Sequence, residues 1–341
     1  MRVKCGWTAI ATIVFLVGCD TAGSNEPASA QLTWANGETP AMSRAAFDDL
    51  MQTISNWDRW GADDQLGTLN LITREKRREA ASLVQEGVAI SMALELNKHQ
   101  DELNVYPFEH EIEIVEWEGH QWAGDTYSVN YHGFAHSHMD GLQHVAHKGM
   151  LYNGLPIDSL TPEGTERLGI QNIAASGIVT RGVLVDIPRF LGVDYLPAGS
   201  AISASDLEAW EAASGVTISS GDVLLIRTGR WVQVAKQGQW DLTKNAAGLH
   251  ASVAAWLKAR DVAVIGCDGV SDVIPSGVEG LINPLHELVI AGLGMPILDN
   301  LDLDAVAEAA NERNRSTFLF VGSPLRVPGG TGSPLNPLAI F

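Results

Sequence analysis

Apolar and polar residues follow one another along the chain in patterns that predict both strands and helices. Short apolar runs at 182–187, 222–227 and 262–266 are typical of strands buried in a sheet. Helices are predicted between them at 205–214, where Ser205 can cap the first turn, and at 249–259. Strands that alternate with helices indicate an α/β fold.

The amino-terminal half adds further predicted elements. Thr73 can cap a helix over 74–86, which Gly87 would end. An apolar strand is predicted at 88–96. Residues 109–117 alternate isoleucine with glutamate, as a half-exposed strand would. The remaining expectations are a structured loop at 56–73, a strand at 127–134 leading into a histidine-rich segment, and an irregular glycine- and proline-rich tail at 328–341.

The first residues have the pattern of an export signal. Arg2 and Lys4 precede an apolar run that is too short to span a bilayer. The run ends in Leu16-Val17-Gly18-Cys19, which resembles the lipobox of bacterial lipoproteins, where cleavage precedes a lipid-bearing cysteine. We therefore expect lipidation at Cys19, export across the inner membrane and anchoring on its periplasmic side or at the cell surface. Cleavage after Ala28-Ser29-Ala30 by the ordinary signal peptidase, which would give a secreted protein, is the alternative.

The expected organisation is a signal peptide at 1–18, a flexible tether at 19–45 and one folded domain at 46–341. Asp20 resembles the signal that keeps lipoproteins at the inner membrane, and small polar residues follow it. After processing, Cys267 is the only cysteine besides the anchor, so no internal disulfide is expected.

Composition excludes some classes of function. A 45% hydrophobic content is sufficient for a large core. The net charge of −19 argues against nucleic-acid binding, which needs clustered lysine and arginine. No Gly-x-Ser-x-Gly elbow indicates a serine hydrolase, and no Gly-x-Gly-x-x-Gly follows a strand as in dinucleotide-binding folds. Cys267 could be a nucleophile, but a buried, inert thiol is the favoured interpretation.

The strongest chemical signal is a cluster of histidines. The chain has ten histidines, and His132, His136, His138 and His144 fall together with Asp140 in one short segment. If the segment is extended, even-numbered side chains share one face. Neutral imidazoles beside a carboxylate are the ligands that zinc or manganese would take together. The alternative is a set of unconnected histidines bonded to backbone.

This segment resembles the motif His-x-Gly-Thr-His-x-Asp-x-Pro-x-His of the cyclase superfamily, which includes bacterial kynurenine formamidases and isatin hydrolases. The resemblance continues in 60–70 (WGADDQLGTLN), Tyr152-Asn153-Gly154, Gly266-Cys267-Asp268 and the tail at 329–334. It covers the chain from about Trp57 to the carboxyl terminus. It implies a single domain with the swivelling β/β/α fold, a homo-oligomer, and a divalent metal such as zinc or manganese.

The resemblance also implies roles for individual residues. His138 and Asp140 match metal ligands, and His144 matches the catalytic acid/base, with a ligand or supporting role as the alternative. His286 and Asp299 resemble the residues of a second metal site. Asp299 replaces the usual glutamate and lies one residue further along than expected, so a single-metal site is the alternative.

One position departs from the motif. Phe134 occupies the place of the first metal ligand. His136 would share the face of His138 in an extended strand and is the predicted substitute, with His132 as the second choice. Phe134 is then assigned to substrate binding, together with Trp57 and Trp60, which could stack on a planar substrate ring. Tryptophans in a loop are equally common as core anchors.

The predicted activity is metal-dependent hydrolysis of a carbon–nitrogen bond in a small amide or lactam, with a lactone or ester as the nearby possibility. A bound cation lowers the pKa of its water and polarises a carbonyl. His144 would move the proton. The alternative is a lipid-anchored binding protein that keeps the cyclase fold without catalysis, an interpretation that Phe134 motivates.

Overall fold

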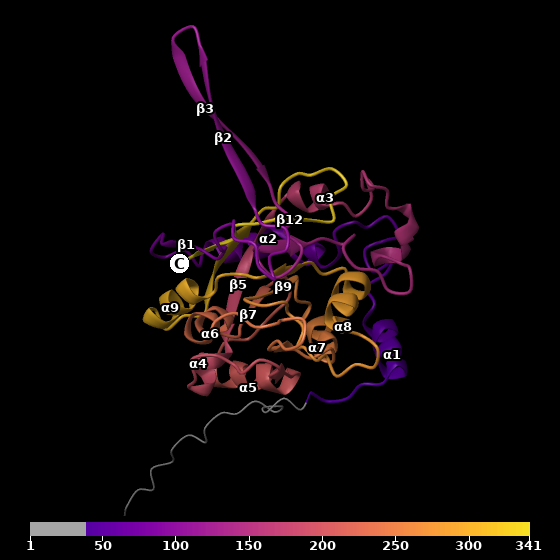
Figure 1. Ribbon diagram of the computed structural model, residues 1–341. Helices are drawn as coiled ribbons and strands as arrows, with labels where there is room; N and C mark the ends of the chain where they lie inside the picture. The colour runs from indigo at the N-terminus through magenta and orange to yellow at the C-terminus, as the bar shows by residue number, and fades with distance from the viewer. Residues whose placement is uncertain (1–38) are drawn as a thin grey trace, which may run out of the picture. The chain divides into compact units, whose positions relative to one another are not determined.

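A nine-stranded mixed sheet forms the centre of residues 39–341, the part of the chain that the computed structural model describes (Figure 1). Together with its covering helices it makes one α/β domain, as predicted. The spatial order of the strands is β1 (Ala89–Ser91), β13 (Leu338–Ile340), β11 (Thr317–Gly322), β5 (Ile178–Asp186), β7 (Val223–Arg227), β9 (Val264–Cys267), β10 (Ile297–Asp299), β4 (His138–Asp140) and β12 (Gly332–Pro334).

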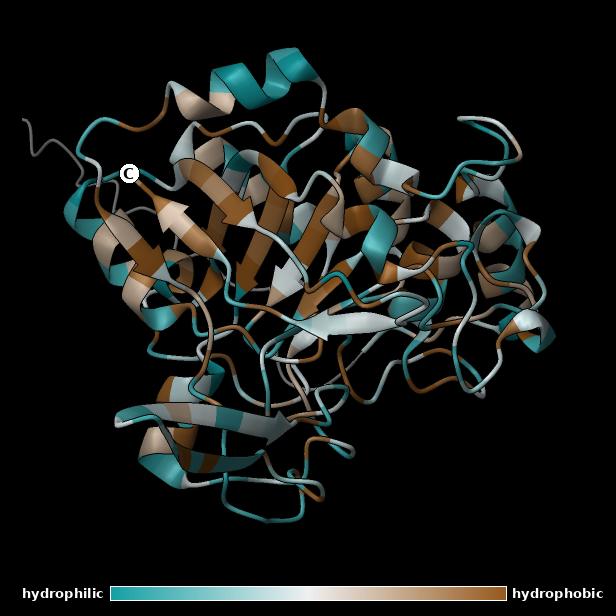
Figure 2. Ribbon diagram, turned by 90° about the horizontal axis from the view of Figure 1, so that it is seen from above, coloured by the Kyte–Doolittle hydropathy of each residue, from teal (hydrophilic) through white to brown (hydrophobic). Residues whose placement is uncertain are grey.

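The middle of this sheet is parallel and buried on both faces. β5, β7, β9 and β10 run parallel, whereas the strands outside them pair antiparallel. Parallel strands between two layers of helices are apolar throughout, and several strands of the sheet are brown in Figure 2. Val183 and Val185 point into one core cluster, and Leu184 points into the other. The alternation follows from the two-residue period of a strand.

The helices and minor elements complete the domain. None of the helices within residues 39–341 is long and apolar enough to cross a membrane. The α-helices are α1 (Arg44–Ile54), α2 (Arg74–Ala81), α3 (Ile170–Ala174), α4 (Ile187–Leu191), α5 (Ala204–Ser214), α6 (Arg230–Gln237), α7 (Val253–Arg260), α8 (Pro284–His286) and α9 (Asp304–Glu312). The others are the 3-10 turns η1 (Gly67–Leu71), η2 (Tyr152–Gly154) and η3 (Ile157–Ser159), the π-helix η4 (Glu287–Leu293), and the paired strands β6 (Ala201–Ile202) and β8 (Gly248–Leu249).

The helix predictions are confirmed in part. Thr73 caps α2 by accepting from the Lys76 amide, but the helix ends earlier than expected. α5 is capped by Ser203, whose side chain and that of Asp206 form a reciprocal capping box, so the expected cap at Ser205 is wrong. The predicted helix from 249 begins only at Val253, because the residues before it belong to β8.

Two strand predictions are wrong because strand pairing, which the local sequence does not show, decides where these strands lie. The tail expected to be irregular contains β12 and β13, which pair with β4 and β11. The strand expected at 127–134 ends at Ser128, and residues 129–137 form a loop.

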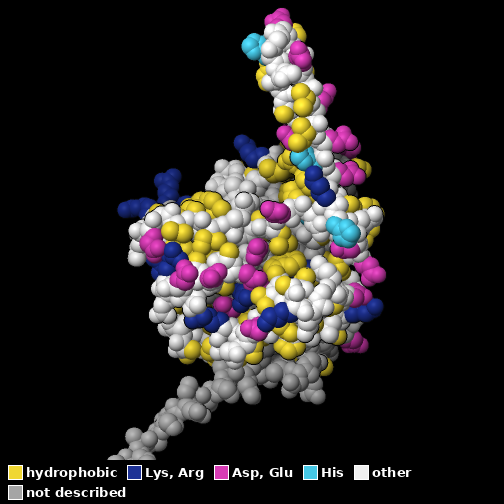
Figure 3. Space-filling view, turned by 60° about the vertical axis from the view of Figure 1, so that its left-hand side comes forward, with side chains coloured by type: hydrophobic (Ala, Val, Ile, Leu, Met, Phe, Trp, Pro, Cys, Tyr) yellow, Lys and Arg dark blue, Asp and Glu magenta, His cyan; other side chains and the backbone are white. Residues whose placement is uncertain are grey.

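A long hairpin of β2 (Glu109–Trp117) and β3 (His120–Ser128) projects from the sheet (Figure 1). The bounds of β2 agree with the alternating pattern, but the expected half-exposure is wrong, since both faces meet solvent. Ile112, Ile114 and Trp117 are 63%, 73% and 65% exposed. Figure 3 shows hydrophobic and acidic side chains along the projection.

The folded region begins earlier than the expected boundary at residue 46. α1 starts at Arg44 with Ser43 as its cap, and Met42 pairs with Val278. The expected signal peptide, lipidation site Cys19 and most of the expected tether lie outside the described residues.

Candidate metal centre

The candidate centre is built on β4, the short strand between β10 and β12. Alternation along β4 turns His138 and Asp140 to one side and Met139 into the core. The antiparallel register places Asp299 of β10 directly opposite His138. Ligand-type side chains from distant parts of the sequence therefore meet at one place in the sheet.

Three imidazoles surround one oxygen of Asp140. The distances to Asp140 Oδ1 are 2.8 Å from His132 Nδ1, 3.4 Å from His138 Nε2 and 3.7 Å from His144 Nε2. Asp140 and His138 are buried, whereas His132 and His144 are partly exposed. His132, His138 and Asp140 offer donor atoms within 4.8 Å of one another, as one metal ion requires.

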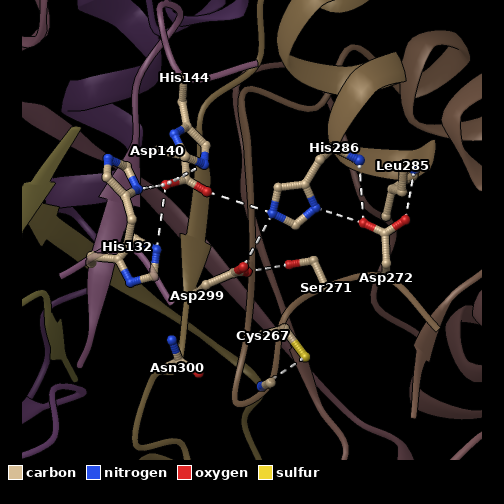
Figure 4. Close-up of polar contacts among 12 residues, drawn as sticks. His132, Asp140, His144, Cys267, Ser271, Asp272, Leu285, His286, Asp299 and Asn300 are labelled. Atoms are coloured by element: carbon tan, nitrogen blue, oxygen red, sulfur yellow. Dashed lines mark hydrogen bonds and ion pairs between the residues drawn. The ribbon is translucent and has the colours of Figure 1, made fainter. Parts of the chain in front are cut away.

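A second group shares Asp140. His286 Nε2 lies 3.5 Å from Asp140 Oδ2 and 3.2 Å from Asp299 Oδ2 (Figure 4). Asp140, His286 and Asp299 are also within 4.8 Å of one another. The Ser271 hydroxyl donates to Asp299 Oδ1 at 2.7 Å and orients that carboxylate. Asp140 thus faces two adjacent groups of donors, one with each oxygen.

Hydrogen bonds fix which nitrogen of two imidazoles faces the centre. His138 Nδ1 donates to the His136 carbonyl at 2.8 Å, and His286 Nδ1 lies 2.6 Å from Asp272 Oδ2. Asp272 is itself held by the backbone amides of Leu285 and His286. Both Nε2 atoms are therefore directed at the carboxylates, an arrangement that metal-binding histidines use.

The donor set fits a divalent cation. Although His132 Nδ1 and Asp140 Oδ1 are close, neither has a hydrogen-bond partner among the described residues. Burial opposes ionisation of Asp140, but the neighbouring imidazoles of His138 and His132 outweigh it and hold the pKa of Asp140 well below its usual value. Burial likewise opposes charge on His286, yet Asp140, Asp272 and Asp299 raise its pKa well above normal. A cation can replace the protons that these carboxylates hold on the imidazoles.

His144 is suited to a different role. Its ring stacks on that of His132, with centroids 3.9 Å apart and an angle of 2°. Burial lowers the pKa of His144 to about 4, although Asp140 acts in the opposite direction. The side chain stays 29% exposed. At neutral pH His144 is a neutral imidazole at the edge of the centre, able to accept a proton.

The structure brings together most of the residues that the sequence singled out. His138, Asp140, His286 and Asp299 converge, and His144 lies beside them. The choice of His136 as the substitute ligand is not supported, because neither donor group includes it. His136 is buried, and its ring nitrogens have no hydrogen-bond partner among residues 39–341. Strand alternation suggested His136, but the strand begins only at His138, and the preceding loop brings in His132 instead.

The aromatic residues assigned to the substrate have mixed positions. Phe134 lines two neighbouring cavities of about 430 and 260 Å³, and His132 lines the smaller one. The Trp57 indole donates to the Ala291 carbonyl at 2.7 Å, and Trp60 stacks against Arg59. The bond from Trp57 is that of a loop anchor, so it favours the structural interpretation of this residue.

Sequence reasoning missed the supporting residues. Asp272 and Ser271 follow β9 and hold His286 and Asp299, yet no motif marked them. Their only signal was their place just beyond the carboxyl end of a predicted parallel strand, where ligand-binding side chains gather.

Known proteins resemble this chain in sequence and fold. A family model described as "Putative cyclase" matches residues 49–272. A solved structure described as a novel cyclase is 30% identical, with a TM-score of 0.77 over 85% of this chain and 99% of that one. Isatin hydrolase A from Ralstonia solanacearum is 19% identical, with a TM-score of 0.52 over 74% of this chain and 91% of its own.

An isatin hydrolase bound to the product analogue thioisatinate is 18% identical, with a TM-score of 0.52 over 76% of this chain and 94% of its own. These more distant likenesses concern the fold. No curated protein sequence matches the chain. The family match covers the ligand segment on β4, and the first structure matches nearly all of its own length. The chain belongs to the putative cyclase family.

Proposed function

We propose that this protein is a metal-dependent hydrolase. The observation that carries the proposal is the position of Asp140, whose two oxygens face two groups of donors in a buried centre. His132 and His138 would hold one divalent ion, and His286 and Asp299 would hold a second. Imidazole and carboxylate ligands suit zinc or manganese. When bound, such an ion activates water and polarises a carbonyl.

The chain's own residues supply proton transfer and a binding cavity. His144 accepts a proton as a neutral imidazole and returns it to the leaving nitrogen or oxygen. Stacking on His132 keeps its ring beside the donors. The cavity of about 260 Å³ that His132, Phe134 and Tyr106 line is large enough for a small substrate beside the centre.

The bond that we propose for cleavage is the carbon–nitrogen bond of a small amide or lactam. The resemblance to kynurenine formamidases and isatin hydrolases supports this choice, and two solved structures of similar fold are isatin hydrolases. A lactone or ester is the neighbouring possibility, since the same chemistry attacks both carbonyl types.

A panel of small aromatic amides, lactams, esters and lactones tests the proposal. The purified protein, loaded with Zn²⁺ or Mn²⁺, should hydrolyse at least one amide or lactam, and chelation should remove the activity. Asp140→Asn should remove it as well, whereas Asp194→Asn, in an exposed ion pair, is the matched control. Turnover of esters alone would change the proposed substrate class from amides and lactams to esters. A metal-loaded protein that hydrolyses nothing on the panel would favour the binding protein. The position of His132 beside Asp140 supports the hydrolase over that alternative.

We also propose that the protein forms homo-oligomers through the β2–β3 hairpin. Two strands without a third strand or a covering helix are marginally stable in water, and this hairpin exposes Ile112, Ile114, Trp117, Trp122 and Tyr127. A hairpin that needs a lasting partner finds one most readily in a second copy of the chain. Its row of glutamates disfavours nucleic acid and anionic lipid as the partner.

Light scattering after size-exclusion chromatography tests this assembly. The wild type should be at least a dimer, and Ile112→Ser with Ile114→Ser should shift it toward the monomer. The matched control is Ile282→Ser, which alters an equally exposed isoleucine away from the hairpin. A monomeric wild type would refute the assembly.

Lipid anchoring at Cys19 and export remain our proposal for the location, with the lipobox-like sequence as support. Expression with labelled palmitate should mark the wild type, and Cys19→Ala should lose the label. An unlabelled wild type that is cleaved after Ala30 would indicate a secreted protein.

A further inference from the structure

The loop that carries the first ligand is held mainly by side chains. Residues 129–137 connect β3 to β4 and contain His132. Among the described residues, and apart from bonds within helices and strands, the backbone of this loop has one hydrogen bond to the backbone of another segment. The Leu335 amide donates it to the Ser137 carbonyl. A loop with so few backbone bonds needs other contacts to keep His132 beside Asp140.

Asn300 supplies several of these contacts. Its Nδ2 donates to the Gly133 carbonyl at 2.7 Å and to the His136 carbonyl at 3.2 Å. The Ser137 hydroxyl donates to the Asn300 carbonyl at 2.6 Å. Asn300 directly follows Asp299, a member of the second donor group, and its bonds reach the loop that carries His132 of the first group.

Arg230 completes the arrangement from the start of α6. Its Nη1 donates to Asn300 Oδ1 at 2.5 Å, and its Nη2 donates to the Phe134 carbonyl at 2.7 Å. The first bond fixes the amide of Asn300 with its nitrogen toward the loop. The second bond holds the loop directly, one residue beyond Gly133.

The burial of the charged Arg230 side chain costs desolvation free energy. The residue is 3% exposed, and its guanidinium donates to the carbonyl oxygens of Asn300, Phe134 and Asp268, with no ion pair to a carboxylate within residues 39–341. The neighbouring Asp268 accepts instead from the backbone amides of Thr228, Gly229 and Arg230. A buried guanidinium that bonds to neutral carbonyls contributes little net stability, because its desolvation offsets the bonds. Burial lowers the pKa of Arg230 to about 10, so it stays charged at neutral pH.

We propose that Arg230 and Asn300 are positioning residues that set the separation between His132 and the other donors of the centre. The pair donates to three carbonyls of the loop, those of Gly133, Phe134 and His136, and links them to the end of β10. The inference rests on the metal centre of the proposed function, but it does not depend on the substrate.

Two measurements on Arg230→Met test this role without turnover. The first is Zn²⁺ affinity by competition with a chromophoric chelator, which should fall about 10-fold or more. The second is cleavage of the metal-free protein by chymotrypsin, which should become at least about 10-fold faster after Tyr131 and Phe134. Arg230→Lys keeps the charge but loses the fork that reaches two acceptors, so it should recover only part of both effects.

The matched control is Arg227→Met. Arg227 is also largely buried, lies in the same stretch of chain and pairs with Asp186 and Asp304, away from the loop. The Arg227→Met substitution should lower the stability of the protein without changing its zinc affinity or the cleavage rate in the loop at 129–137. Wild-type affinity and wild-type cleavage in a folded Arg230→Met protein would overturn the proposal. If Arg230→Met fails to fold, Asn300→Ser replaces it, with the same two readouts. If the wild type binds no zinc, the proposed function fails, and the cleavage rates still decide the role of Arg230.

Discussion

His132 Nδ1 lies 2.8 Å from Asp140 Oδ1, and neither atom has a hydrogen-bond partner among the described residues. Two polar atoms that approach so closely without a hydrogen bond fit a shared cation. This relationship supports our proposal that His132 fills the place that Phe134 leaves open in the motif.

The first prediction separates His132 from His136. His132→Ala should weaken Zn²⁺ binding by about 10-fold or more, because it removes one of three donors. His136→Ala is the matched control and should leave zinc affinity within about twofold of the wild type. Competition with a chelator measures both variants. Equal losses would restore His136 as a ligand.

The second prediction concerns Asp272, which orients His286. Asp272→Ala removes the acceptor of His286 Nδ1, so affinity at the Asp140, His286 and Asp299 group should fall about 10- to 100-fold. Asp272→Asn keeps one acceptor oxygen and should lower the metal affinity of this group less than Asp272→Ala does. Metal titration should show the second equivalent weakened and the first retained. A parallel loss of both equivalents would mean that the two groups do not act separately.

The third prediction follows from the lowered pKa of His144. Burial shifts the pKa of His144 from 6.5 to about 4. Between pH 6.5 and about 4, the unfolded chain therefore binds a proton at this site and the folded chain does not. The stability of the metal-free protein should therefore fall as the pH drops from 6.5 toward 4. His144→Gln has no such group, and urea unfolding at several pH values should show a shallower fall. If the free energy of unfolding depended on pH identically in both proteins, that result would contradict the lowered pKa of His144.

The fourth prediction concerns a buried carboxylate with two cationic partners, away from the centre. Asp222 is fully buried and contacts Arg181 Nη2 at 2.5 Å and Lys76 Nζ at 2.6 Å. Asp222→Ala should lower the free energy of unfolding by about 3–5 kcal/mol, because it leaves two cations without a counter-charge. Asp194→Ala removes an exposed pair with Lys236 and should cost less than about 1 kcal/mol. Denaturant unfolding measures both, and equal costs would show that burial does not matter here.

The sequence predicted the central strands well because their apolar runs are long and bounded by turns. β7 begins one residue after its predicted start, and β2 has its predicted bounds. It failed for β12 and β13, whose three residues each form a strand only by pairing with β4 and β11. Local propensity carries no information about partners so far along the chain.

The ligands that belong to the sequence motif could be predicted. The ligand whose position depends on loop conformation could not. His138 and Asp140 share a face of β4, as strand alternation requires. His132 reaches Asp140 only because residues 129–137 leave the strand geometry that the alternation assumed. Arg230 and Asn300, which hold that loop, have no sequence signature of this role.

Diffraction from crystals grown with Zn²⁺, recorded on both sides of the zinc absorption edge, would locate the metal ions directly. We expect an anomalous peak among His132, His138 and Asp140, and a second peak between Asp140, His286 and Asp299 if both groups are filled. A peak coordinated by His136, or no peak within a protein that is otherwise folded as described, would contradict the proposed metal centre.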